Sequence, residues 1–168
     1  MTGSVRPGSL TTAVMRILSA DFRSQGFSTL EINPVGVEVP HFGAGLPESL
    51  RLTYVDQLKS ARGVVLCTPE YNGSYSAVMK SLVESLGYPS PLDSKIIALV
   101  GIATGVIGAV KALEHLRSVC SHCGAHVLPF ALSISEAHKI IDKGGACTSD
   151  KVSQQINEIA KKLIQQID

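Results

Sequence analysis

The stretch Gly63-Val-Val-Leu-Cys-Thr-Pro-Glu-Tyr-Asn-Gly73 determines the fold class that this sequence predicts. Residues 63–68 form a continuous apolar run, which is typical of a strand buried on both faces of a parallel sheet. The run ends abruptly at Pro69, and the residues after it favour turns. A helical pattern then follows over residues 76–86. A buried strand, a tight loop and a helix in this order indicate an α/β fold.

The rest of the chain alternates between helix and strand on both sides of this stretch. We expect helices over residues 12–24, 47–58, 107–120 and 149–167, and strands over residues 27–32, 95–101 and 125–130. Residues 33–45 hold two prolines and three glycines and are expected to form a loop, whereas residues 133–148 are weakly patterned. No repeat or second domain is visible, so we predict a single domain over residues 1–168 with a doubly wound parallel sheet.

One strand of such a sheet is missing from the sequence. In the strand order 2-1-3-4-5 an apolar first strand lies between the second and the third, and it feeds the first loop. Only Met1 and Thr2 precede Gly3 here. The first strand is therefore missing or truncated at the N-terminus, either because the reading frame is truncated or because an atypical sheet has closed the gap.

Composition excludes several classes of function. Fifteen basic and fourteen acidic residues give a net charge of +1, so no global charge favours nucleic acid or an acidic membrane surface. No apolar run has the roughly 20 residues that a membrane span requires. The N-terminus has no apolar signal segment, and the four cysteines are not spaced like a disulfide framework. We expect a cytoplasmic protein with reduced thiols, without membrane insertion or nucleic-acid binding.

The first candidate site is the segment Gly3-Ser-Val-Arg-Pro-Gly-Ser-Leu-Thr-Thr12, which leads directly into a helix. A helix N-terminus attracts phosphate through its free N–H groups and its positive dipole end. Ser4, Ser9 and Thr11 add hydroxyl groups, and Arg6 adds a guanidinium fork. The segment matches neither a P-loop nor a dinucleotide fingerprint. On these residues alone, an ordinary Ser/Thr helix cap is the competing interpretation.

The second candidate site is Pro69-Glu-Tyr-Asn-Gly73, at the carboxyl end of the predicted strand. Open α/β sheets bind ligands at this edge. A tight loop there presents backbone N–H and C=O groups in fixed directions, suited to the edge of a flavin ring, and Tyr71 adds a flat apolar surface. A plain strand-to-helix turn is the alternative that these residues leave open.

The combination of the two loops resembles the NADPH-dependent FMN reductase family, which includes quinone, chromate and azo-compound reductases. The resemblance runs from Gly3 to about Phe130, and Pro69–Asn72 is its most specific part. It implies a flavodoxin-like fold, FMN as the cofactor, NAD(P)H as the co-substrate, a small-molecule electron acceptor and a homodimer or homotetramer. It further implies a site made by the phosphate-binding residues Ser4, Arg6, Ser9 and Thr11 and the ring-binding residues Pro69, Glu70, Tyr71, Asn72, Gly73, Thr104 and Gly105.

We expect an FMN-dependent oxidoreductase that passes hydride from NAD(P)H to quinones, azo compounds or metal oxyanions. Because the cofactor supplies the chemistry and no nucleophile–base pair is visible, no catalytic residue is assigned. The alternative is a non-catalytic flavodoxin-like module, either an electron carrier or a sensor, and a decayed reductase is one form that it could take. Cys120 and Cys123 have the spacing of a metal or redox pair, but they fall at the end of a predicted helix, where the dipole disfavours thiolate. We assign no metal site.

Overall fold

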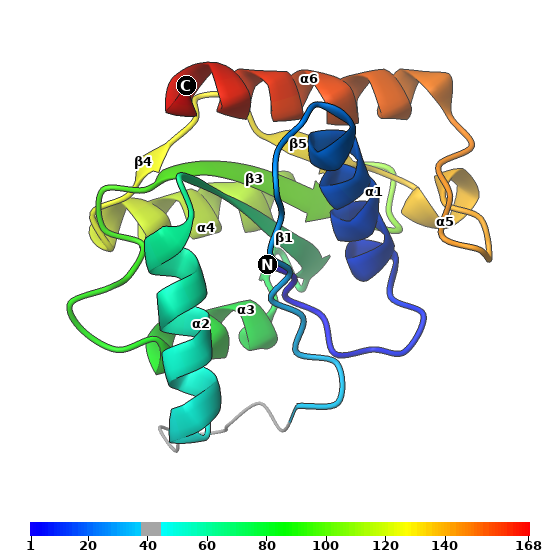
Figure 1. The fold of residues 1–168 in the computed structure, drawn as a ribbon. Coiled ribbons are helices and arrows are strands. Elements are labelled where there is room, and N and C mark those ends of the chain that lie inside the picture. Colours follow the sequence, from blue (N-terminus) through cyan, green and yellow to red (C-terminus); the bar gives the residue numbers. More distant parts are fainter. Residues whose placement is uncertain (38–44) are drawn as a thin grey trace.

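A computed structural model describes residues 1–37 and 45–168 of the chain. The fold is α/β, with helices on both sides of a mostly parallel sheet (Figure 1). Its helices are α1 (Leu10–Ser24), α2 (Glu48–Ser60), α3 (Ala77–Ser85), α4 (Val110–His122), α5 (Ala137–Ile140) and α6 (Asp150–Ile167). Its strands are β1 (Gly63–Tyr71), β2 (Ser74–Tyr75), β3 (Ile96–Ile102), β4 (His126–Val127) and β5 (Leu132–Ile134). None of these helices is long and apolar enough to span a bilayer.

The sheet is built on the pairing of β1 with β3. These strands run parallel, with Gly63 opposite Ile96 and Pro69 opposite Ile102. β3 also pairs in parallel with β4 at its start and with β5 at its end, while β2 forms a short antiparallel hairpin with β1. The carboxyl ends of β1 and β3 therefore lie next to each other, which brings the loops that follow them to the same edge of the sheet.

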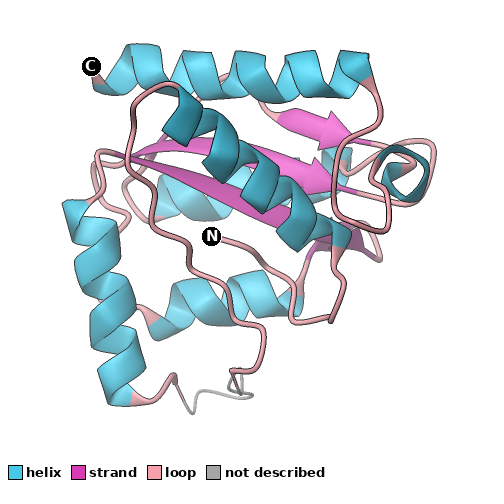
Figure 2. Cartoon of the chain, turned by 45° about the vertical axis from the view of Figure 1, so that its right-hand side comes forward, coloured by secondary structure: helices cyan, strands magenta, loops and turns pink. Residues whose placement is uncertain are grey.

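Apolar clusters cover the two faces of this sheet. One face packs against α2, α3 and α4 through residues such as Leu58, Leu82 and Leu116. The other face packs against α1 and α6, with Leu18 and Ile159 in the contact. Figure 2 shows α6 along one side of the sheet and α2 and α3 on the other. Burial of both faces explains why β1 and β3 are nearly continuous apolar runs rather than alternating ones.

The N-terminus lies inside the fold, beside β1 (Figure 1). Thr2 forms a parallel bridge with Cys67, and its N–H donates to the Ile32 carbonyl at 3.0 Å. Residues 1–3 thus lie at the position of a first strand, between the segment 27–32 and β1. With β3 and then β4 and β5 beyond β1, this arrangement broadly corresponds to the predicted order 2-1-3-4-5.

Several sequence-based boundaries are wrong. Residues 27–32 form no strand, and of their backbone groups only the Ile32 carbonyl pairs with the N-terminal segment. α4 begins at Val110 rather than at residue 107, since Gly108 has a φ of +82° that no helix tolerates. The strand predicted over 125–130 is confined to β4, and β5 was not predicted. Residues 38–44 of the expected loop lie outside the described part of the chain.

Candidate cofactor site

The first loop is tied to the sheet at one end and to a helix at the other. Ser9 is the N-cap of α1, and its hydroxyl accepts from the Thr12 N–H at 3.3 Å. Ser4 is buried and its hydroxyl accepts from the Arg6 N–H at 3.4 Å. A side chain at Gly3 would come within 2.8 Å of Met79 and of Ser76, so the close approach of this loop to α3 requires glycine.

The second loop is a tight hairpin that joins β1 to β2. Asn72 and Gly73 form its turn, with φ values of +51° and +75°. Positive φ at both central residues is the requirement of a two-residue hairpin turn, which Asn-Gly meets well. The hairpin leaves the Tyr71 side chain 43% exposed at the end of β1, while Pro69 stays buried.

The third loop follows β3 and is held by β5. The Ala103 N–H donates to the Ile134 carbonyl, and the Ala109 N–H donates to the Ser133 hydroxyl, both at 2.9 Å. Thr104 and Gly105 are exposed between these anchors.

The three loops surround a cavity of about 330 Å³. This volume falls within the usual range for small-molecule sites, roughly 300–1,000 Å³. Of the eleven residues that the sequence nominated, eight line the cavity: Ser4, Arg6, Ser9, Thr11, Pro69, Glu70, Tyr71 and Thr104. Asn72, Gly73 and Gly105 are not in its lining; they belong to the turns next to it. Ile102 and Leu10 also line it and were not nominated, since nothing in an apolar residue type signals a ligand contact.

Two side chains of the cavity have partners of their own. The Arg6 guanidinium lies over the Tyr71 ring, 5.7 Å from its centroid, so the first and second loops are in contact. The Glu70 carboxylate accepts from the Ala112 N–H at 3.0 Å, within the first turn of α4. α4 has no N-cap hydrogen bond from a side chain of its own cap residue, so Glu70 supplies an acceptor to that helix end.

Ser76 was missed as a positioning residue for these loops. Its buried hydroxyl donates to the Gly3 carbonyl and accepts from the Met79 N–H, so it joins the first loop to the N-terminus of α3. The Thr68 hydroxyl accepts from the Ser76 N–H at 3.2 Å. A serine three residues before the apolar face of a helix is the usual N-cap pattern, and that signal was present in the sequence.

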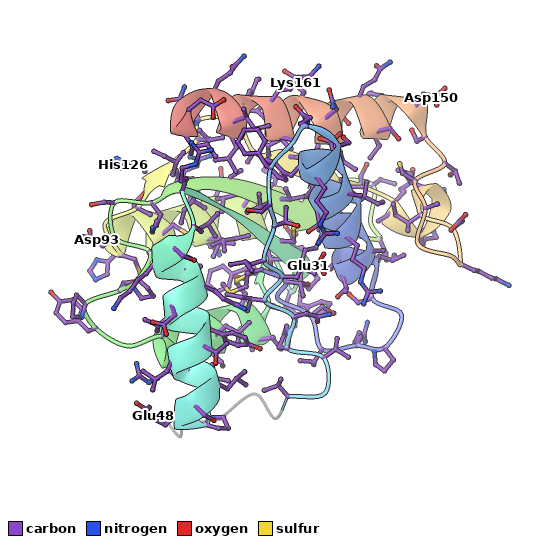
Figure 3. All side chains as sticks on the ribbon, in the orientation of Figure 1. Glu31, Glu48, Asp93, His126, Asp150 and Lys161 are labelled. Atoms are coloured by element: carbon purple, nitrogen blue, oxygen red, sulfur yellow. The ribbon has the colours of Figure 1, made fainter. Side chains whose placement is uncertain are left out.

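The cysteines lie away from this cavity. Cys67 and Cys120 are buried, and burial raises the pKa of their thiols to about 11 and about 12. All four cysteines are free thiols. Among the described residues, no group of three or more His, Cys, Asp or Glu side chains is arranged to hold a metal ion. The charged residues labelled in Figure 3 lie mainly on the outside of the fold, with Glu31 on the segment that passes the N-terminus.

One known protein family matches most of this chain in sequence. Residues 1–139 match the model of the NADPH-dependent FMN reductases. The chain belongs to the NADPH-dependent FMN reductase family. The resemblance inferred from the two loops is thus confirmed, as is the flavodoxin-like fold, and the family is one of oxidoreductases that use FMN and NADPH.

The match covers different shares of the relatives' lengths. An NAD(P)H-dependent FMN reductase of Pseudomonas aeruginosa is 27% identical over 169 residues, covering 97% of this chain and 90% of the relative. The NADH:(hydroxy)cinnamate reductase subunit CrdA of Vibrio ruber is 30% identical over 115 residues, and the chain spans only 56% of its length. Quinone reductases and azoreductases also match.

Among solved structures, the flavoenzyme NAD(P)H:(acceptor) oxidoreductase FerB of Paracoccus denitrificans superposes with a TM-score of 0.82. It is 26% identical to this chain, and the match covers 99% of this chain and 94% of FerB. Flavodoxins superpose at 14–15% identity, which shows the shared fold alone.

The residues at the cavity fit the FMN that this family uses. A phosphate is negatively charged and accepts hydrogen bonds, and the start of α1 offers the positive end of a helix dipole together with hydroxyl groups and Arg6. No hydrogen bond within the described residues uses the N–H groups of Leu10 or Thr11. These two donors of the first helical turn are therefore free for a ligand.

Proposed function

We propose that this protein binds FMN in the 330 Å³ cavity and passes hydride from NAD(P)H to small acceptors such as quinones, azo compounds or metal oxyanions. The observation that carries the proposal is the convergence of three loops at one edge of the sheet, with the N-terminus of α1 at one end of the cavity and the Tyr71 ring in its lining. Relatives that reduce quinones and azo compounds support this range of acceptors.

The phosphate end of the site is assigned to the first loop. Ser4, Ser9 and Thr11 donate hydroxyl hydrogen bonds, and Arg6 provides the compensating positive charge. Ser9 also caps α1, so its hydroxyl oxygen both orders the helix start and lies at the cavity wall. A pre-ordered helix end binds an anion at a lower entropic cost than a flexible loop would.

The ring end of the site is assigned to the second and third loops. Pro69, Glu70 and Tyr71 line it from β1, and Thr104 and Gly105 close it from the loop after β3. Asn72 and Gly73 act through the turn that presents Tyr71. Backbone N–H groups of these loops favour the negative charge of the reduced cofactor, because they are fixed in a partly dry site.

Bound FMN supplies the hydride-transfer chemistry, and the chain positions it. Tyr71 shields the ring from water, while Glu70 fixes the loop to α4 through the Ala112 N–H. Thr104 lines the cavity, Gly105 follows it in the sequence, and both residues are exposed, so this loop is the side from which acceptors would enter. No side chain is assigned a proton-transfer role.

The second candidate function is a non-catalytic flavodoxin-like module that carries electrons or senses redox state. Membership of a reductase family favours the enzyme. Consumption of NAD(P)H in the presence of a quinone separates the two, because a carrier alone does not oxidise NAD(P)H at a substantial rate.

We further infer that the protein acts in the cytoplasm as a homodimer or homotetramer. Val106 and Ile107, on the loop after β3, are 75% and 83% exposed, and such neighbouring apolar side chains favour a protein contact. Light scattering on a sizing column measures the assembly directly, and a monomer at micromolar concentration would contradict this inference.

The test of the proposed function is steady-state oxidation of NADH and NADPH by the FMN-loaded protein, with and without benzoquinone. We expect quinone-dependent oxidation that requires FMN. Removal of Tyr71 and Asn72 by alanine substitution should weaken FMN retention and lower the rate. Oxidation that is independent of FMN, or unchanged retention in the double variant, would contradict the assignment.

A further inference from the structure

Helix α4 lies along the hairpin that joins β1 to β2. Besides the hydrogen bond that its first turn donates to Glu70, two of its side chains contact the turn of the hairpin. His115 Nδ1 lies 3.0 Å from the Ser74 hydroxyl. One helical turn earlier, the Lys111 stem crosses the hairpin, and its Cδ lies 3.5 Å from the position that a Cβ on Gly73 would take. Lys111 is therefore held over this turn by its own stem.

The ammonium of Lys111 has no acidic partner. Its side chain is exposed, and none of the ion pairs among the described residues involves it. The nearby Glu70 carboxylate accepts from the Ala112 N–H, and Glu114, three residues along α4, forms no ion pair with Lys111. An uncompensated positive charge thus lies beside the hairpin turn.

The other cations near the cofactor cavity are accounted for. Arg6 lines the cavity and is assigned to the FMN phosphate. Lys139 of α5 pairs with Glu136. Lys143 belongs to the loop after α5, which packs against the start of α1 through Gly145. On the hairpin side of the cavity, Lys111 is therefore the cation that is available to an anionic ligand.

NADPH, the electron donor of this family, brings such an anion. It differs from NADH by one phosphate group, on the 2′ oxygen of the adenosine ribose. A lysine ammonium is a compact point charge that commonly binds phosphate oxygens. A residue that contacts this phosphate distinguishes the two coenzymes, because NADH has nothing to offer it.

The size of the cavity indicates which part of NADPH meets Lys111. Hydride transfer requires the nicotinamide to contact the FMN ring, which is assigned to the end lined by Tyr71 and Thr104. FMN occupies the cavity of about 330 Å³, so the pyrophosphate and the adenosine of the donor extend over its rim. Lys111 does not line the cavity but lies on the adjoining turn, where the distal half of the donor arrives.

We propose that Lys111 binds the 2′-phosphate of NADPH and thereby makes the protein prefer NADPH to NADH. The ammonium donates to the phosphate oxygens while the stem stays packed on the turn at Gly73. Because the stem is already placed, binding orders only the end of the side chain. This inference rests on the proposed function, since it places the nicotinamide on FMN at the ring end of the cavity.

The experiment compares Lys111→Met with the unsubstituted protein, both loaded with FMN. Methionine keeps a stem on the turn and removes the ammonium. Lys161→Met, on the exposed face of α6, is the matched control for the loss of one positive charge. The kcat and KM are measured for NADPH and for NADH at saturating benzoquinone.

We expect Lys111→Met to raise the KM for NADPH about three- to thirtyfold, since a charged hydrogen bond at an exposed site contributes less than a buried one. The kcat and the KM for NADH should stay close to those of the unsubstituted protein, and Lys111→Arg should retain the preference for NADPH. A KM that rises equally for both coenzymes would overturn the proposal, because Lys111 would then serve a group that both share. Equal KM values of the unsubstituted protein for NADPH and NADH would also overturn it.

A binding measurement separates this proposal from the proposed function. Isothermal titration of the FMN-loaded protein uses adenosine 2′,5′-bisphosphate and adenosine 5′-monophosphate as probes. We expect the unsubstituted protein to bind the bisphosphate more tightly and Lys111→Met to lose that difference. The titration needs no turnover, so a lack of quinone-dependent oxidation would contradict the proposed function alone. Equal affinities of the unsubstituted protein for the two nucleotides would overturn the role of Lys111.

Discussion

Arg6 is the cation of the first loop, and in this structure its guanidinium lies over the Tyr71 ring. Its side chain is exposed and lines the cavity. Among the described residues, no acidic side chain lies within ion-pair distance of it. An anion entering the cavity therefore meets an available charge-assisted donor.

Replacing Arg6 by alanine is expected to weaken FMN affinity by about ten- to a hundredfold, because a hydrogen bond to a charged group contributes roughly 1.5–3 kcal/mol. Isothermal titration with FMN measures the effect. Arg16→Ala removes the same charge from the exposed face of α1 and serves as the control. Equal losses of FMN affinity in the two variants would show that Arg6 acts only through the net charge of the protein.

The four thiols should separate into two classes at the residue scale. Burial raises the pKa of Cys67 to about 11 and that of Cys120 to about 12, while Cys123 and Cys147 are half-buried. Because the thiolate is the reactive form, Ellman's reagent at pH 8 is expected to titrate at most two thiols of the native protein quickly and all four after denaturation. Fast reaction of all four thiols in the native protein would contradict the burial of Cys67 and Cys120.

At the scale of elements, Glu70 connects the hairpin after β1 to the start of α4. Its carboxylate provides both an acceptor for the Ala112 N–H and a negative charge near the positive end of the helix. The sequence nominated Glu70 for the cofactor ring, and its partner on α4 could not be predicted, because Ala112 lies 42 positions further along the chain.

Glu70→Ala is expected to lower the free energy of unfolding by about 0.5–2 kcal/mol, the usual contribution of a helix cap. Glu70→Gln keeps an acceptor oxygen and should lose less. Urea denaturation measures both, with Glu114→Ala on the exposed face of α4 as the control. If Glu70→Gln lowered the free energy of unfolding as much as Glu70→Ala, the charge of Glu70 and not its hydrogen bond would account for the stabilisation.

Long, strongly patterned elements were predictable from the sequence, and short ones were not. α6 shows its apolar stripe through Ile156, Ile159 and Leu163, and β1 shows its apolar run. β5 has three residues and forms because β3 offers a free edge near its end, a partner that no local pattern reveals. Residues 27–32 are the opposite case: their sequence pattern predicts a strand, but they form none in the structure.

The site follows the same rule. Residues at loop positions could be nominated from their types and from the two loop motifs, and eight of these residues line one cavity. Ser76, which joins two loops across 73 positions of sequence, depends on the close approach of Gly3 to α3. That contact arises from the packing of the whole sheet.

At the scale of the whole molecule, the buried N-terminus should make stability depend on pH. Desolvation lowers the pKa of the Met1 ammonium from its usual value near 8. The unfolded chain then binds more protons than the folded one below pH 8, so the free energy of unfolding rises with pH toward 8, by at most about 1.4 kcal/mol per unit. Above about pH 9 the raised pKa of the Cys67 thiol acts in the opposite direction.

Urea unfolding between pH 6 and 8 measures this slope in the protein that begins at Met1. A control variant with Gly-Ser-Gly-Ser inserted between a new initiator methionine and Met1 carries its ammonium four or more residues away from the buried position. The difference between the two curves isolates the contribution of the Met1 ammonium. A difference that is flat or that falls with pH would contradict the burial of a charged amine in the sheet.

The central claim is that the three loops at the carboxyl edge of the sheet form a working FMN site, as membership of the family implies. An anaerobic absorbance spectrum of the purified protein tests it most directly, taken after addition of FMN, then of NADPH, then of a quinone. We expect bound flavin bands that bleach with NADPH and return with quinone. A protein that stays colourless after addition and removal of excess FMN, or a bound flavin that NADPH does not bleach, would contradict it.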